Sequence, residues 1–275
     1  MGKKGRGRRR IGCFAISGLM LAALILSLAQ CAVGGREKSK TDASARQSRQ
    51  QPVSAEQTVE SFARQHGLSV DDWPASLIEL LSKNPETRDF VLNYPFCKDK
   101  QYTTDLSEYE SCDEVPLFMQ WDERWGYSSY SGELFGLSGC GPTCLSMVCV
   151  YLKKDATYTP RYVADFAAEN GYSVCGSGSA WTLISQGGKG LGLDVRELPL
   201  DENTVDRELD GGHPVICIMG PGDFTSSGHF IVLCENEGGK IRLNDPNSKS
   251  RSERLWDYEE LEPQIKNLWA VKNAE

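Results

Sequence analysis

Apolar and polar positions divide the chain into stretches of different character. Residues 11–33 contain no charged side chain, and a run of that length is enough to cross a bilayer as a helix. Residues 34–55 are polar and lack large apolar groups, which predicts a flexible linker rather than a packed domain. Apolar residues at helical spacing return from residue 56, and an alternating pattern replaces them after Leu193.

Residues 56–112 predict a small helical subdomain. Asn84 is suited to cap a helix, and Pro85 is suited to its first turn, where no backbone N–H is needed. This helix should stop before Tyr94, because a proline follows. The apolar spacing predicts three short helices, at residues 56–66, 73–82 and 85–93.

Residues 113–275 predict a second domain, in which helices come first and strands follow. The expected helices lie at residues 140–151, 160–170, 181–189 and 205–209. The expected strands lie at residues 193–198, 214–219, 229–234, 241–243 and 268–272. Helices followed by strands that are joined by short glycine turns define an α+β domain, with the helices packed on an antiparallel sheet.

Charge is distributed unevenly along the chain. The net charge is −8, but residues 1–10 carry six positive charges, so the rest carries −14, which is −8 less 6. An acidic body argues against nucleic acid as a partner. The basic tip should stay in the cytoplasm and send the rest outside, so residues 11–33 predict a cell-membrane anchor with an extracytoplasmic domain. Small residues near Ala29 and Cys31 also allow a cleaved signal peptide and a secreted protein.

Ten cysteines are present, two of them within residues 11–33. They form no regular CxxC pairs, so a structural zinc site is not expected, and no other metal or organic cofactor is implied. Cys97 and Cys112 flank a polar loop and are candidates for a disulfide outside the cell, although the sequence leaves their redox state open.

Cys140 is the strongest candidate for chemistry. It lies between two glycines, and Pro142 two residues later suits the first turn of a helix. The unpaired N–H groups and the positive end of the dipole at a helix N-terminus favour a thiolate, which is the form a nucleophile needs. A buried structural cysteine beside a turn is the alternative interpretation.

Two histidines follow residue 112, and they differ in setting. His213 precedes Pro214 at a turn edge and is a weak candidate. His229 follows small residues and begins an apolar strand, so its ring is both accessible and firmly held, as a general base must be. The next strand ends at Asn244 and Asp245, and in a hairpin that end lies beside His229, so Asp245 could orient the imidazole. If Asn244 does so instead, the third residue is displaced by one position.

An oxyanion formed during acyl transfer needs N–H donors. The backbone N–H of Cys140 and the side chain of Gln120 are the candidates, although its spacing alone favours a surface residue at Gln120.

Taken together, these motifs resemble the C39-like peptidases of the papain-like superfamily. The matching segments are Gln120-x-Asp122-x-Arg124-Trp125, Gly139-Cys140-Gly141-Pro142-Thr143, Gly228-His229-Phe230 and Asn244-Asp245-Pro246. The resemblance covers roughly residues 113–275. It implies a papain-like cysteine peptidase fold with Cys140 as nucleophile, His229 as base and acid, Asp245 as orienting carboxylate and Gln120 in the oxyanion hole.

The expected activity is therefore that of an extracytoplasmic thiol hydrolase acting on peptide or cell-wall peptide amides through an acyl-enzyme. Two alternatives stay open: a non-catalytic binding module on the same fold, and a transglutaminase-like thiol acyl transferase. The natural substrate and the oligomeric state cannot be read from the chain.

Overall fold

The computed structural model describes residues 53–274. The α-helices are α1 (Ala55–His66), α2 (Ala75–Lys83), α3 (Arg88–Cys97), α4 (Phe135–Ser138), α5 (Cys140–Lys153), α6 (Pro160–Glu169), α7 (Gly188–Gly190), α8 (Glu202–Asp210), α9 (Lys249–Glu253) and α10 (Tyr258–Leu261). Single turns of other helix types are η1 (Val70–Asp72), η2 (Pro85–Thr87), η3 (Ser107–Tyr109), η4 (Leu183–Gly187) and η5 (Glu262–Gln264).

The main sheet has six strands in the order β5-β10-β6-β7-β8-β9, and every neighbouring pair is antiparallel. Its strands are β5 (Leu193–Glu197), β6 (Val215–Met219), β7 (His229–Glu237), β8 (Lys240–Asn244), β9 (Leu255–Trp256) and β10 (Ile265–Asn273). The pairs β1 (Ser129–Tyr130) with β2 (Glu133–Leu134) and β3 (Ser173–Val174) with β4 (Gly178–Ser179) form two small hairpins. The predicted α+β architecture with an antiparallel sheet is confirmed.

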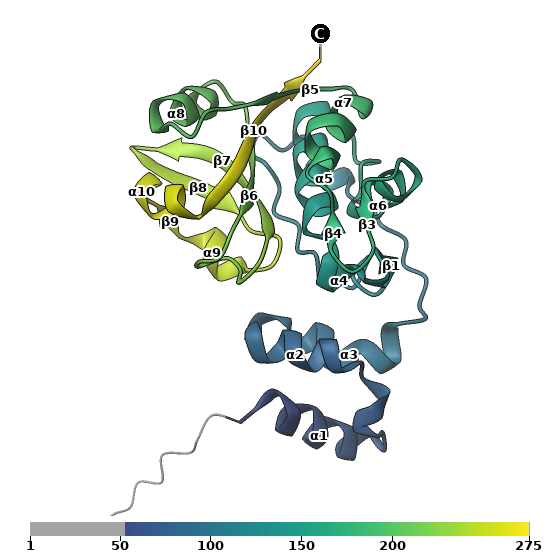
Figure 1. Ribbon diagram of the computed structural model, residues 1–275. Coiled ribbons are helices and arrows are strands. Elements are labelled where there is room, and N and C mark those ends of the chain that lie inside the picture. Colours follow the sequence, from purple (N-terminus) through teal and green to yellow (C-terminus); the bar gives the residue numbers. More distant parts are fainter. Residues whose placement is uncertain (1–52, 275) are drawn as a thin grey trace, which may run out of the picture. The chain divides into compact units, whose positions relative to one another are not determined.

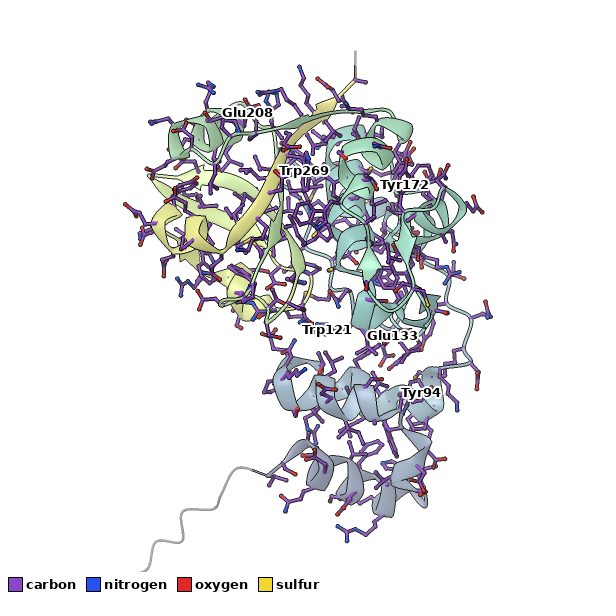
Figure 2. All side chains as sticks on the ribbon, in the orientation of Figure 1. Tyr94, Trp121, Glu133, Tyr172, Glu208 and Trp269 are labelled. Atoms are coloured by element: carbon purple, nitrogen blue, oxygen red, sulfur yellow. The ribbon has the colours of Figure 1, made fainter. Side chains whose placement is uncertain are left out.

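Both faces of this sheet are covered, which explains why β6 is buried along its whole length. Successive side chains of a strand point to opposite faces. Ile216 and Ile218 belong to the core that contains α5, whereas Val215 and Cys217 belong to the core that contains α8 and α10. Trp269 of β10 (Figure 1) belongs to the core that contains α5, and Figure 2 shows it between the sheet and the helices.

Helix α5 is the buried helix of the domain and contacts β7 and β10. Its residues from Gly141 to Val150 are all buried, as an uninterrupted apolar segment predicts. Cys144 and Cys149 lie within this interior, where they pack as small apolar groups.

The three predicted N-terminal helices are present, but the third extends beyond its predicted end. Helix α3 continues through Pro95 to Cys97. A proline inside a helix leaves the carbonyl four residues earlier without its usual donor. That carbonyl, of Val91, accepts a hydrogen bond of 2.7 Å from the indole N–H of Trp73, so a tertiary contact replaces the missing bond.

Three further predictions need correction or stay open. The segment predicted as one helix at residues 181–189 is a π-helical turn, η4, followed by the short α7. Cys97 and Cys112, the candidates for a disulfide, are both free thiols. Within residues 53–274 no helix is both long and apolar enough to span a bilayer, and the predicted span at residues 11–33 lies outside the described part of the chain.

Candidate active site

Cys140 is the first residue of α5, as its glycine-flanked position predicts. Both flanking positions require glycine for space. A Cβ on Gly139 would lie 2.5 Å from the ring of Phe135, and one on Gly141 would lie 2.8 Å from Oγ of Ser179. Because the chain is packed closely on each side, the backbone at Cys140 is held in one position at the start of the helix.

His229 is the first residue of β7, where it pairs with Met219 of β6, and its side chain is 9% exposed. Its Nε2 lies 2.7 Å from Oδ1 of Asp245, and the other side of the imidazole is left for the thiol of Cys140, which lines the same two hollows. The structure therefore brings Cys140, His229 and Asp245 together in one site.

Asp245 is fully buried and accepts three hydrogen bonds. Besides His229, the donors are the backbone N–H of Asn247 at 2.8 Å and Nε of Arg251 at 2.5 Å. Asn244, the neighbouring candidate for this place, points elsewhere, because its amide donates to the carbonyls of Val115 and Pro116. Sequence reasoning missed Arg251 and Asn247, since neither residue belongs to a motif.

The electrostatics of the three groups favour the charged pair of thiolate and imidazolium. Burial raises the pKa of the Cys140 thiol, but its bond to His229, the positive charge there and the N–H groups of Phe230 and Gly141 outweigh burial and lower it overall. Burial likewise lowers the pKa of His229, yet the adjoining Asp245 carboxylate and the thiolate raise it to about 10. The charge and hydrogen bond of His229 hold the pKa of Asp245 below its ordinary value despite its burial.

Gln120 is buried beside the cleft, and its position is fixed from two sides. Its backbone N–H donates to the carbonyl of Pro246, and its side-chain Nε2 donates to the carbonyl of Gly136 at 2.8 Å. An amide nitrogen carries two hydrogens, so one remains for an oxyanion. The first turn of α5 also offers N–H groups without a partner inside the helix, as every helix N-terminus does.

Two hollows meet at the candidate nucleophile, and both are lined by Cys140 and His229. The larger, of about 1070 Å³, is bounded by the loop at residues 221–228 and by η2 of the helical subdomain. The smaller, of about 480 Å³, is bounded by the turn at residues 176–179 and by Trp181. An extended chain could therefore lie across Cys140 with a wall on each side.

Other titratable candidates lie outside this cleft. His213 contacts Glu208, with Nδ1 at 3.1 Å from Oε2, and does not line either hollow. Within residues 53–274, no group of three histidine, cysteine or acidic side chains is arranged to hold a metal ion.

The protein has an α+β fold in which a cysteine, a histidine and a carboxylate lie together. The C39-like peptidases, which the sequence motifs resemble, are expected to have the same combination. The model of the Peptidase_C39 like family matches residues 112–273, more than half of the chain, and the chain belongs to this family. A search of curated proteins found no match.

Two solved structures are similar to this chain at low sequence identity. One is the peptidase domain of Streptococcus ComA, a bi-functional ABC transporter involved in a quorum-sensing pathway. It has 18% identity and a TM-score of 0.43, with 58% of this chain and 99% of that chain covered. The other, from Bacillus anthracis, is described as a C39-like peptidase. It has 16% identity and a TM-score of 0.42, with 64% of this chain and 100% of that chain covered. Family membership rests on the sequence match and not on these likenesses.

Proposed function

We propose that this protein is a cysteine peptidase or amidase that uses Cys140, His229 and Asp245 as a catalytic triad. The observation that carries the proposal is the buried His229, which is bonded through Nε2 to Asp245 and shares both hollows with Cys140, whose pKa it lowers. A rigid imidazole between a thiol and a carboxylate is the arrangement that activates a sulfur nucleophile.

The reaction would proceed in two halves. The Cys140 thiolate attacks the amide carbonyl carbon, the C–N bond breaks, and the imidazolium of His229 gives its proton to the leaving amine. His229 then takes a proton from water, the hydroxide attacks the thioester, and the acid leaves as the thiol is restored. The N–H of Cys140 and the free amide hydrogen of Gln120 would stabilise the oxyanion in both halves of the reaction, each by about 3 kcal/mol.

Alkylation of Cys140 tests the proposal without knowledge of the substrate. The full chain is treated with iodoacetamide at mildly acidic pH, and the modified cysteines are identified by mass spectrometry. We expect Cys140 to react first, and His229→Ala to slow that reaction. Labelling of Cys140 no faster than that of the exposed Cys175 would contradict the proposal.

Cleavage itself is tested with libraries of internally quenched peptides and with cell-wall peptide fragments, using Cys140→Ala as the blank. Addition of a primary amine separates hydrolysis from acyl transfer, because a transferase would join the amine to the acyl group. We expect the free acid as the main product.

We also propose that the domain acts outside the cytoplasm. The support is the sequence alone: an uncharged run at residues 11–33 follows a strongly basic tip. Fusing residues 1–55 to a reporter that is active only after export tests this, with a matched fusion that lacks residues 11–33. N-terminal sequencing of the exported fusion then separates an anchor from a cleaved signal peptide.

A further inference from the structure

Glu86, in η2 of the helical subdomain, accepts several hydrogen bonds from the loop at residues 247–251. Its Oε1 accepts hydrogen bonds from the hydroxyls of Ser248 and Ser250, both at 2.7 Å, and from the N–H of Ser250 at 3.3 Å. Its Oε2 accepts a fourth bond, of 2.7 Å, from the N–H of Lys249. Burial raises the pKa of Glu86, but these donors lower it overall, so the group holds the loop as a carboxylate.

Asn247, the first residue of this loop, is held on one side and holds Asp245 on the other. Its carbonyl accepts bonds from the amide of Asn84, at 2.5 Å, and from the indole N–H of Trp121, at 3.2 Å. Figure 2 labels Trp121, which also belongs to the apolar core of the helical subdomain. The N–H of Asn247 donates to Asp245, so two hydrogen bonds, through Asn247, connect Asn84 of the subdomain with the candidate triad.

The other end of the loop repeats this relation. Ser248 caps α9, because its Oγ accepts a hydrogen bond from the backbone N–H of Arg251. The side-chain Nε of Arg251 in turn donates to Oδ2 of Asp245. The hydroxyl that caps α9 is the same one that donates to Glu86. Both protein donors that hold Asp245 opposite His229 therefore come from a loop that Glu86 fixes.

We propose that Glu86 is a positioning residue for the candidate triad, acting through residues 247–251 on the carboxylate of Asp245. The inference rests on the proposed function and extends it, since it makes the helical subdomain a working part of the active site. Glu86 lines the same hollow as Cys140 and His229 but bonds only the loop, through which its effect on the triad would pass.

A mobile loop would change the charge balance at the nucleophile. If the donors from Asn247 and Arg251 no longer hold Asp245 in one orientation, its carboxylate bonds His229 for only part of the time. The imidazolium is then less stabilised, and the thiolate beside it loses part of its positive partner. The thiol of Cys140 should therefore stay protonated to higher pH.

The test compares the pH profiles of Cys140 alkylation in the full chain, Glu86→Gln and Glu79→Gln. Gln keeps the shape of Glu86 but replaces the carboxylate, whose two oxygens accept four hydrogen bonds, with a neutral amide. Glu79 is a matched control, because it lies in the same subdomain and pairs only with the exposed Lys83. For Glu86→Gln we expect the acid limb of the profile to move up by about one pH unit, so that alkylation on that limb slows roughly tenfold. Glu79→Gln should leave the profile unchanged.

A second variant tests the route through the loop and serves if Glu86→Gln folds poorly. Ser250 is exposed, so Ser250→Ala removes one donor to Glu86 at little risk to folding, and we expect a smaller shift in the same direction. The double variant should be no worse than Glu86→Gln alone, because both changes break the same contact.

Three results would overturn the inference: an unchanged profile in a folded Glu86→Gln protein whose melting temperature alone has fallen, an unchanged profile in Ser250→Ala, or fully additive shifts in the double variant. None of them touches the proposed function. That function fails separately, if Cys140 of the unmutated protein has no enhanced reactivity to begin with.

Discussion

Two cysteines one turn apart on α5 show what the candidate site adds to an ordinary buried thiol. Cys144 is fully buried, and burial together with neighbouring acidic groups raises its pKa well above the ordinary value. Burial raises the pKa of Cys140 as well, but His229 and two backbone N–H groups near the sulfur lower it overall. The two thiols also differ in depth, because Cys140 is only partly buried and lines the cleft, whereas Cys144 is enclosed. The comparison indicates that a nucleophilic thiol needs both charged partners and access to the cleft.

Replacing each cysteine in turn by alanine should give the largest difference in activity. Cys140→Ala removes the proposed nucleophile, so we expect kcat/KM for any cleaved peptide to fall roughly 10⁵-fold. Cys144→Ala should change kcat/KM by less than about threefold, because it removes only packing atoms away from the cleft. A kcat/KM for Cys140→Ala close to that of the unmutated protein would contradict the comparison.

Next in size is His229→Ala, which should make Cys140 resemble Cys144. Without the imidazole the thiol keeps the cost of burial and loses its charged partner, so its pKa should rise above the ordinary value. We expect a loss of roughly 10⁴-fold in kcat/KM. Alkylation rates of both cysteines, followed by mass spectrometry, provide the check. A Cys140 that still reacts far faster than the exposed Cys175 would mean that the helix N-terminus alone activates it.

Asp245→Asn should have a smaller effect on turnover, roughly 10²- to 10⁴-fold, with a distinct signature in pH. The pKa of His229 is raised to about 10, so the imidazolium that protonates the leaving amine persists until the pH passes that value. Removing the carboxylate leaves burial to lower the pKa, and the alkaline limb of kcat/KM should move to lower pH.

The pH profile of kcat/KM for each protein measures this shift. Asn244→Ala is the matched control. It lies next in sequence but bonds Val115 and Pro116, so it should leave the alkaline limb in place. An unchanged limb in Asp245→Asn would remove Asp245 from the triad.

The smallest effect tests the packing role of Cys144. Cys144→Ser places a hydroxyl in an apolar core, and we expect a loss of about 1–3 kcal/mol in the free energy of unfolding. The pH profile of Cys140 alkylation should not change. Urea denaturation measures the first quantity, and a shift in the second would show that the two thiols are coupled.

Much of the main domain could be predicted from local patterns. Short apolar runs bounded by glycine or proline turns located most strands of the sheet, and the unbroken apolar run after Cys140 located the buried helix. The hairpin argument for Asp245 also predicted the observed contact, because β7 and β8 are adjacent and antiparallel. These features depend on neighbours in sequence or on one tight connection, which is why the chain itself displays them.

The rest depends on contacts that no local pattern encodes. The bond from Trp73 that lets α3 continue through Pro95 joins residues 18 positions apart. Glu86 reaches a loop more than 160 positions later, and one bond of the Gln120 amide goes to Gly136. In each case the side chain is ordinary in its own segment, and only the folded partner gives it a role.

The position of β10 has a consequence for timing. This last strand lies between β5 and β6 inside the sheet, rather than at its edge. While the chain is being made, Cys140 appears well before His229, and β10, which joins β5 to β6 in the sheet, appears after both. At ribosomal rates of about 5–20 residues per second, several seconds separate the thiol from its base. A growing chain thus carries Cys140 without its base, and the enzyme that we propose should stay inactive until β10 has been made.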